Sequence, residues 1–306
     1  MRATVAFNRP VSTAYLHLGM AVPAFPTSFL AGEFVMIRPH WVADPLLPRA
    51  FSIYRVSKEG TCGGNGVPVV EILYKVVGKG TDYLSRMEIG EKIEILGPLG
   101  NAFTLSAGIT TAVLVAGGIG VPPIAALAAQ LAAIRNPQSA ICNLVVFLGG
   151  KTSEDILCVQ DFEEAGAVIH ITTEDGSLGT RGLVTDLLAP FLKTRDGHAT
   201  GQSGNQGEPN CPMAQLPNRP SFRLYTCGPP GMLAAVARLA EELAVPCQVS
   251  VEANMACGFG ACMGCAIEVK AEQKSYKLVC MDGPVFDSRD CLLYTSPSPR
   301  DRTRYR

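Results

Sequence analysis

Short apolar runs separated by turn residues dominate the first third of the chain. They are rich in β-branched and aromatic residues and cover residues 34–37, 51–56, 69–77 and 92–96. Strands of this length, bounded by glycine and proline, are typical of a small antiparallel barrel. Residues 1–105 are therefore predicted to form a β-barrel domain, with a glycine-rich hairpin loop over residues 58–68.

The pattern changes near residue 110, where strand-like runs begin to alternate with helical segments. The runs cover residues 111–116, 144–148, 168–172 and 224–227. Such alternation predicts a doubly wound α/β domain, which we assign to residues 106–245. Within it, residues 194–220 are rich in glycine, asparagine and proline and predict a flexible insert. Residues 246–290 are predicted to form a third, small domain, so the fold class is multidomain α+β.

Composition narrows the class of protein. Hydrophobic residues make up 47% of the 306 residues, charged residues 17%, and the net charge is −1. This balance excludes a protein that binds nucleic acid through bulk charge and a chain that is disordered throughout. No apolar run reaches about 18 residues, and the N-terminus lacks a basic region followed by a long apolar stretch. The sequence therefore predicts a soluble cytoplasmic protein.

The last sixteen residues are set apart from the fold. Residues 291–306 begin with a stretch that resembles the translation of a sequencing adaptor. We expect this tail to be read-through, with the authentic coding sequence ending near Asp290, and we assign it no function.

Four of the eleven cysteines are grouped near the C-terminus in a C-x4-C-x2-C pattern, with the fourth fifteen positions later. They are Cys257, Cys262, Cys265 and Cys280. This is the plant-type spacing of a [2Fe–2S] cluster, and the glycines between the cysteines let the backbone fold round a cluster. Zinc is the alternative, although cysteine zinc sites usually use paired C-x2-C knuckles and only one is present. The odd number of cysteines and the lack of a secretion signal argue against a disulfide framework.

A second group of motifs, in the barrel segment, indicates a flavin site. An arginine before a strand can pair with a pyrophosphate, and aromatic and hydroxyl groups after it can contact a flavin ring. A Gly-Lys-Gly-Thr turn that opens a helix can bind phosphate through free N–H groups. The candidate residues are Arg49, Ala50, Phe51, Ser52, Leu73, Tyr74, Lys75, Gly80 and Thr81.

Two glycine-rich turns after predicted strands indicate a nicotinamide dinucleotide site. Open α/β sheets bind ligands at the carboxyl ends of their strands, and a glycine turn before a helix can hold a pyrophosphate. Neither turn carries the full G-x-G-x-x-G fingerprint. The candidate residues are Gly117, Gly118, Gly120, Cys227, Gly228 and Pro229.

Taken in order, the R-x-F-S, G-K-G-T, GGIG and CGPPGM motifs resemble those of the ferredoxin-reductase-like flavoproteins. Residues 252–265 and 279–286, together with 173–182, are more specific and resemble the electron-transfer subunits of NAD-dependent (class 1B) dihydroorotate dehydrogenase. The resemblance covers residues 5–290 apart from the insert at 194–220. One departure is Ala50, where the family commonly has proline; because Arg49 and Ser52 remain, we expect flavin binding to be intact.

The resemblance implies a relay of electrons. A catalytic subunit that contains FMN oxidises dihydroorotate, and electrons pass through this chain's [2Fe–2S] cluster and FAD to NAD+, within a heterotetramer of two plus two subunits. No residue of this chain is implied as a catalytic acid or base. A related subunit of sulfide dehydrogenase or of an NAD(P)H–ferredoxin oxidoreductase is an alternative. A redox-sensing or zinc-binding interaction module is the non-enzymatic alternative.

Overall fold

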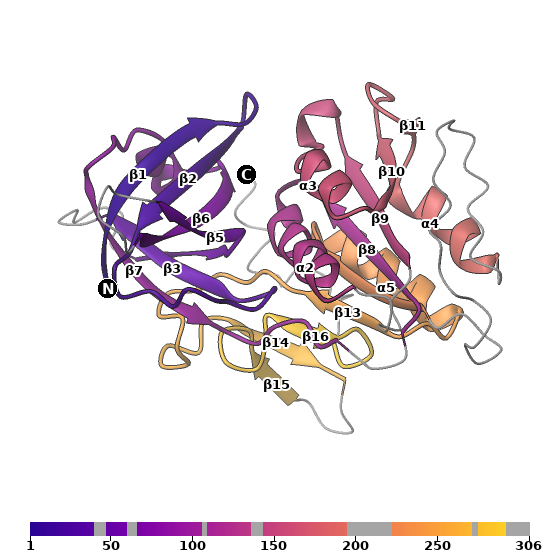
Figure 1. The fold of residues 1–306 in the computed structure, drawn as a ribbon. Helices are drawn as coiled ribbons and strands as arrows, with labels where there is room; N and C mark the ends of the chain where they lie inside the picture. The colour runs from indigo at the N-terminus through magenta and orange to yellow at the C-terminus, as the bar shows by residue number, and fades with distance from the viewer. Residues whose placement is uncertain are drawn as a thin grey trace, which may run out of the picture.

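The computed structural model describes residues 1–39, 47–59, 66–105, 109–135, 143–194, 222–270 and 275–291. It contains two seven-stranded sheets and a two-stranded hairpin (Figure 1). Most of the predicted hairpin loop, nearly all of the predicted insert at 194–220 and the tail after Cys291 lie outside these residues.

Seven antiparallel strands form the N-terminal domain, in the order β4-β3-β7-β1-β2-β6-β5. The elements are β1 (Arg2–Pro10), β2 (Tyr15–Ala21), β3 (Phe34–Pro39), β4 (Arg49–Ser52), β5 (Arg55–Glu59), β6 (Val67–Lys75), α1 (Lys79–Ser85) and β7 (Lys92–Leu99). Successive side chains of a strand point to opposite faces, and the inward-facing ones form one apolar core that includes Val35, Ile37, Ile72 and Tyr74. The prediction of an antiparallel β domain is confirmed.

The run predicted over residues 51–56 is two strands rather than one. The Ile53 N–H donates to the Glu33 carbonyl at 3.0 Å, whereas the next N–H, of Tyr54, donates to the Glu71 carbonyl at 2.9 Å. Because Glu33 precedes β3 and Glu71 lies in β6, the chain changes its partner strand at this corner. The single predicted strand is therefore interrupted at Ile53 and Tyr54, although both of these residues are apolar.

The second sheet has the order β11-β10-β9-β8-β12-β13-β16 and is parallel except for β16. Its strands are β8 (Thr111–Gly117), β9 (Asn143–Gly150), β10 (Val168–Thr173), β11 (Thr180–Arg181), β12 (Phe222–Cys227), β13 (Cys247–Ser250) and β16 (Val285–Asp287). Its helical segments are η1 (Gly118–Gly120), α2 (Val121–Ile134), η2 (Ser153–Asp155), α3 (Val159–Glu164), α4 (Val184–Lys193) and α5 (Pro230–Glu242). Within the described part of the chain, no helix is long and apolar enough to cross a membrane.

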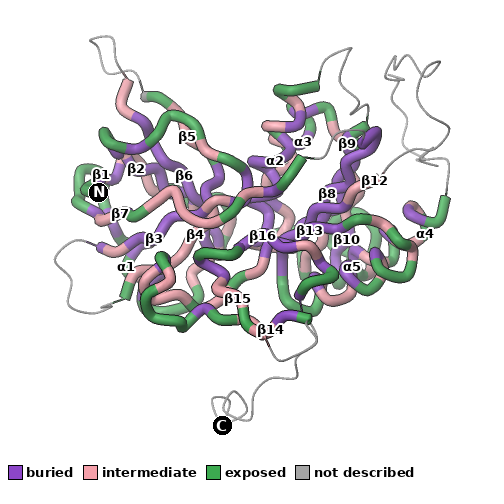
Figure 2. The backbone as a smooth tube through the Cα atoms, turned by 90° about the horizontal axis from the view of Figure 1, so that it is seen from below, coloured by how far each residue is buried: buried purple, intermediate pink, exposed green. Residues whose placement is uncertain are grey.

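Helices cover both faces of this sheet. Helices α2 and α3 pack on one face around Leu114 and Phe162, and α4 and α5 pack on the other around Val113 and Leu188. The central strands are consequently buried along most of their length (Figure 2). The strand order reverses between β8 and β12, which is the position at which open α/β sheets bind ligands.

The C-terminal segment is built onto the edge of this sheet. Strand β13 pairs in parallel with β12, and β16 pairs antiparallel with β13, so the sheet extends past the predicted domain boundary at residue 245. Between β13 and β16 lie the loop with the grouped cysteines and a hairpin of β14 (Ala266–Val269) and β15 (Ser275–Leu278). Cys291, predicted to begin the read-through tail, is buried and forms an isolated bridge with Val269.

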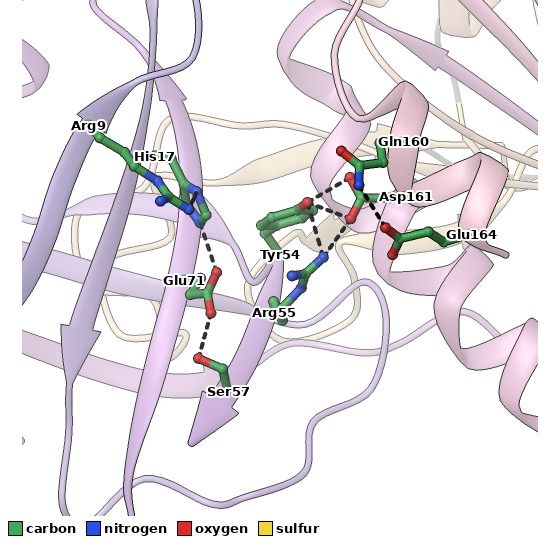
Figure 3. Close-up of polar contacts among 9 residues, drawn as sticks. All are labelled: Arg9, His17, Tyr54, Arg55, Ser57, Glu71, Gln160, Asp161 and Glu164. Atoms are coloured by element: carbon green, nitrogen blue, oxygen red, sulfur yellow. Dashed lines mark hydrogen bonds and ion pairs between the residues drawn. The ribbon is translucent and has the colours of Figure 1, made fainter. Parts of the chain in front are cut away.

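Polar side chains join the barrel to α3 (Figure 3). The Tyr54 hydroxyl lies 2.7 and 2.8 Å from the two carboxylate oxygens of Asp161, and the Arg55 guanidinium contacts the same carboxylate at 2.5 Å. Behind Tyr54, within the barrel, His17 and Glu71 form a buried pair at 2.9 Å. These contacts help to fix the barrel relative to the α/β domain, and with it the cleft between the two.

Candidate functional site

The four grouped cysteines form two pairs. The Sγ atoms of Cys265 and Cys280 lie 3.3 Å apart, and Cys262 lies near enough to Cys257 to lower the pKa of its thiol. Each iron of a [2Fe–2S] cluster takes two protein ligands, so this pairing fits such a cluster. Among the described residues, no three His, Cys, Asp or Glu side chains converge on a single metal position.

The backbone around the cysteines supplies N–H groups to the sulfur atoms. The Gly264 N–H donates to Cys262 Sγ at 3.4 Å, and the Cys280 N–H donates to Cys265 Sγ at 3.5 Å. Gly258 has a φ of +83°, in a region that residues with a side chain rarely adopt. Hydrogen bonds to the sulfurs of an iron–sulfur centre help to set its reduction potential.

The thiols differ in acidity. Burial opposes ionisation of Cys257, but backbone N–H groups of the loop outweigh it and lower the pKa of this thiol to about 6. Burial and the adjacent Cys265 raise the pKa of Cys280 to about 11. Because the thiolate is the form that binds metal, binding must displace a proton from Cys280.

Arg49 and Gly80, which belong to separate candidate flavin motifs, lie side by side. The Arg49 Nε lies 3.1 Å from the position that a Cβ on Gly80 would occupy. The arginine is held by a hydrogen bond from Nη1 to the Leu47 carbonyl at 2.8 Å. Thr81 holds the turn, because its Oγ1 accepts the Val77 N–H at 2.9 Å. The arrangement places a cation beside the start of α1, as a pyrophosphate site requires.

The other candidate flavin residues lie in different environments. Leu73 and Tyr74 are buried, and the Tyr74 ring packs edge-on against Phe51 at 6.0 Å, so Tyr74 can reach a ligand only through its backbone. Ser52 is half-buried at the end of β4.

Met36 connects the candidate flavin strand to the cysteine loop. It lies opposite Ala50 in the pairing of β3 with β4 and belongs to the same apolar core as Cys265 and Cys280. Its Cγ lies 2.5 Å from the position of a Cβ on Gly258, so the loop packs directly on this side chain. One layer of side chains therefore separates the strand that begins with Arg49 from the grouped cysteines.

A cleft of about 450 Å³ opens at the carboxyl ends of the parallel strands. Its lining includes five of the six residues predicted to bind a dinucleotide, which are Gly117, Gly118, Gly120, Gly228 and Pro229. The sixth, Cys227, is buried beneath the turn. A Cβ on Gly120 would lie 2.5 Å from the Gly228 Cα, so glycine is needed where the two turns meet.

Residues that the sequence analysis did not assign to a site also line this cleft, among them Tyr15, Lys151, Asp155, Glu174 and Glu252. Lys75, predicted with the flavin group, lines it as well. Glu174 lies just beyond the carboxyl end of the strand predicted over residues 168–172, and this position could have identified it. Tyr15 carries no such signal, because it reaches the cleft only through the packing of the barrel on the α/β domain.

The surface around the cysteine loop is apolar. Phe259, Met263 and Met281 are 56%, 61% and 55% exposed. A groove of about 550 Å³ is lined by Phe259, with Met36, Arg38, Leu96 and Cys257 among its other lining residues. Contiguous exposed apolar surface is typical of an interaction site.

Two family models match the chain. Residues 252–291 match the iron–sulfur cluster binding domain of dihydroorotate dehydrogenase B, and residues 114–238 match the oxidoreductase NAD-binding domain. The fold is similar to the solved structure of an NADH-dependent reduced ferredoxin–NADP oxidoreductase, with a TM-score of 0.72 and 24% identity over 94% of this chain and 88% of that one. The ferredoxin-reductase-like fold is thereby confirmed.

Curated relatives match over nearly the whole length. The chain is 35% identical over 258 residues to the electron transfer subunit of dihydroorotate dehydrogenase B (NAD(+)) from Desulforamulus reducens, covering 84% of each. It is 33% identical over 295 residues to the subunit of the same name from Bacillus caldolyticus, covering 95% of this chain and 98% of that relative. The resemblance inferred from the motifs is confirmed, and the chain belongs to the family of electron-transfer subunits of NAD(+)-dependent dihydroorotate dehydrogenase B.

Proposed function

We propose that this chain passes electrons, released from dihydroorotate by a partner subunit, to NAD+ in the synthesis of pyrimidines. When bound, a [2Fe–2S] cluster and FAD supply the redox chemistry that delivers a hydride to NAD+. The residues of this chain hold these groups and NAD+ at fixed separations, and none acts as a catalytic acid or base.

The contiguity of the three candidate sites is the observation that carries this proposal. Met36 packs against the cysteine loop and lies opposite Ala50 on the flavin strand. On the other side, Lys75 at the end of β6 lines the same cleft as Gly118. A flavin held on β4 and β6 thus has the cysteines on one side and the dinucleotide cleft on the other, as a relay requires.

Each group has a proposed set of ligands. The cluster is held by Cys257, Cys262, Cys265 and Cys280. FAD is held by Arg49, Ala50, Phe51, Ser52, Gly80 and Thr81, with Lys75 and the backbone of Leu73 and Tyr74. NAD+ binds at Gly117, Gly118, Gly120, Gly228 and Pro229, above the buried Cys227.

The partner is a catalytic subunit that contains FMN, and the complex has two copies of each subunit in the cytoplasm. The partner docks on the exposed apolar surface of Phe259, Met263 and Met281. Docking there brings the donor flavin to the cysteine loop, and the adjoining groove provides further contact area.

Activity of the chain with and without its partner tests the proposal. The purified chain, loaded with FAD and cluster, is expected to oxidise NADH with artificial acceptors but not to reduce NAD+ with dihydroorotate. Adding the catalytic subunit should confer that second activity. Dihydroorotate-dependent reduction of NAD+ by the chain alone would contradict the relay and would require a pyrimidine site in this subunit.

A further inference from the structure

The dinucleotide cleft runs across the ends of neighbouring strands, and a carboxylate lies towards each of its two ends. Glu174 directly follows β10, and Glu252 lies two residues after β13. Strands β9, β8 and β12, with the glycine turns of the cleft, lie between them in the sheet. At a spacing of about 4.8 Å between strands, β10 and β13 are about 19 Å apart. The two carboxylates therefore face different parts of an extended dinucleotide.

Glu252 lies at the end of the cleft that is nearer to the cysteine loop. It is five positions before Cys257, on the segment that joins β13 to that loop. The nicotinamide of a bound dinucleotide must reach the flavin, and Met36, which pairs with the proposed flavin strand β4, packs on the same loop. The nicotinamide end of the cleft is therefore the end at Glu252, and the adenosine end is at Glu174.

The backbone holds Glu252 beside the turn that follows β12. The preceding residue, Val251, donates its N–H to the Pro284 carbonyl at 2.9 Å. Cys227 ends β12 and is buried beneath the turn, and burial together with the nearby Glu252 carboxylate raises the pKa of its thiol. The charge of Glu252 is thus placed close to the floor of the cleft.

The Glu252 carboxylate is exposed to the cleft and unpaired. Within the part of the chain that the structure describes, it has no hydrogen bond or ion pair. The surrounding protein partly desolvates it and raises the pKa of the carboxyl. Asp155, which lines the same cleft, is by contrast bonded to Tyr15 and Lys75. Glu252 is therefore a charge that is fixed by its backbone and available to a ligand.

We propose that Glu252 faces the nicotinamide ring and makes the cleft prefer NAD+ to NADH. The ring of NAD+ carries a positive charge, and the addition of a hydride makes the ring neutral. The carboxylate attracts the charged ring and has no such attraction for the neutral one. It therefore favours binding of the substrate and release of the product. This inference rests on the proposed assignment of the cleft to NAD+.

Equilibrium binding of three probes to the full-length, FAD-loaded, oxidised chain tests the inference, at a mildly alkaline pH at which the carboxyl is ionised. NAD+ has the charged ring, tetrahydro-NAD has a neutral ring that cannot donate a hydride, and ADP-ribose has no nicotinamide. Glu252→Gln should weaken NAD+ binding by about two- to fivefold, the value of an exposed ion pair, and leave the other two probes unchanged. Glu252→Asp keeps the charge and should keep most of the preference for NAD+.

Controls separate this inference from the assignment of the cleft. Glu174→Gln removes the carboxylate at the adenosine end and should leave the ratio of NAD+ affinity to tetrahydro-NAD affinity unchanged. Gly118→Ala adds a methyl group to the glycine turn and should weaken all three probes if the cleft is the dinucleotide site at all. The FAD content of each variant shows whether the flavin site is intact.

Two results would overturn the inference. One is equal weakening of NAD+ and tetrahydro-NAD by Glu252→Gln, because the residue would then act on a part that both probes share. The other is unchanged NAD+ affinity in this variant, because the ring would then lie elsewhere in the cleft. In either case, weakened binding in Gly118→Ala would leave the assignment of the cleft standing. Unchanged ADP-ribose binding in Gly118→Ala would instead contradict that assignment, and the inference with it.

Discussion

At the scale of single residues, the cysteine loop gives a direct test of the metal ligands. Cys280→Ser should abolish iron–sulfur absorbance and leave FAD bound, because the flavin residues lie in the barrel. Cys247→Ser is the matched control, since Cys247 is equally buried in β13 but lies outside the two cysteine pairs. Full cluster absorbance in Cys280→Ser would show that the fourth ligand is misassigned.

Arg49 is the residue on which flavin affinity should depend most. Arg49→Ala removes the cation that lies beside Gly80 and should lower FAD affinity by roughly ten- to a hundredfold, the effect of a lost hydrogen bond to a charged group. Arg86→Ala is the control, because Arg86 is exposed at the end of α1 and forms an ion pair with Asp82. Flavin content measured after extensive dialysis distinguishes the two variants, and equal retention would contradict the site.

Some site residues could be predicted from the sequence and others could not. The four cysteines could be predicted because their spacing is that of a [2Fe–2S] cluster loop. Gly118 could be predicted because it lies in a glycine turn between a strand and a helix. Lys75 is next to Tyr74 in sequence but faces the cleft, while Tyr74 faces the barrel core. Asp155 meets Tyr15 only because two domains pack together, and no local pattern encodes a contact over 140 positions.

At the scale of elements, the parallel sheet was predicted well because its strands are continuous apolar runs between glycine turns. The strands β1 and β2 were not singled out, because polar residues such as Arg9 and His17 interrupt their apolar runs. The break between β4 and β5 was missed because it depends on a change of partner strand rather than on the residues themselves. The C-terminal edge of the sheet was missed for the same reason, since β13 is set by its pairing with β12.

The contact between the barrel and α3 should contribute measurable stability. Asp161→Asn weakens two bonds from Tyr54 and the pair with Arg55, so the free energy of unfolding should fall by about 1 kcal/mol and Tm by about 2–4 °C. Glu164→Gln on the same helix is the control, because the hydrogen bond of Glu164 is with Gln160, within α3 itself. Calorimetry of the FAD-loaded chain makes the comparison, and equal Tm values for the two variants would count against this contact.

At the scale of the whole molecule, the apolar surface at the cysteine loop should govern assembly. Phe259→Glu places a charge on that surface and should weaken binding of the catalytic subunit by roughly tenfold or more, with the cluster retained. Val168→Glu is the control, because Val168 is half-exposed at the amino end of β10, away from the loop. Analytical ultracentrifugation of the mixed subunits measures the effect, and a fully formed complex with Phe259→Glu would place the interface elsewhere.

The central claim is that the grouped cysteines connect the partner's chemistry to NAD+. The most direct test is anaerobic addition of dihydroorotate and NAD+ to complexes that contain either the unmodified chain or Cys265→Ser, each with both flavins bound. We predict that the unmodified complex forms NADH, whereas the complex without a cluster reduces only the flavin of the catalytic subunit. Formation of NADH at the same rate in both complexes would contradict the account.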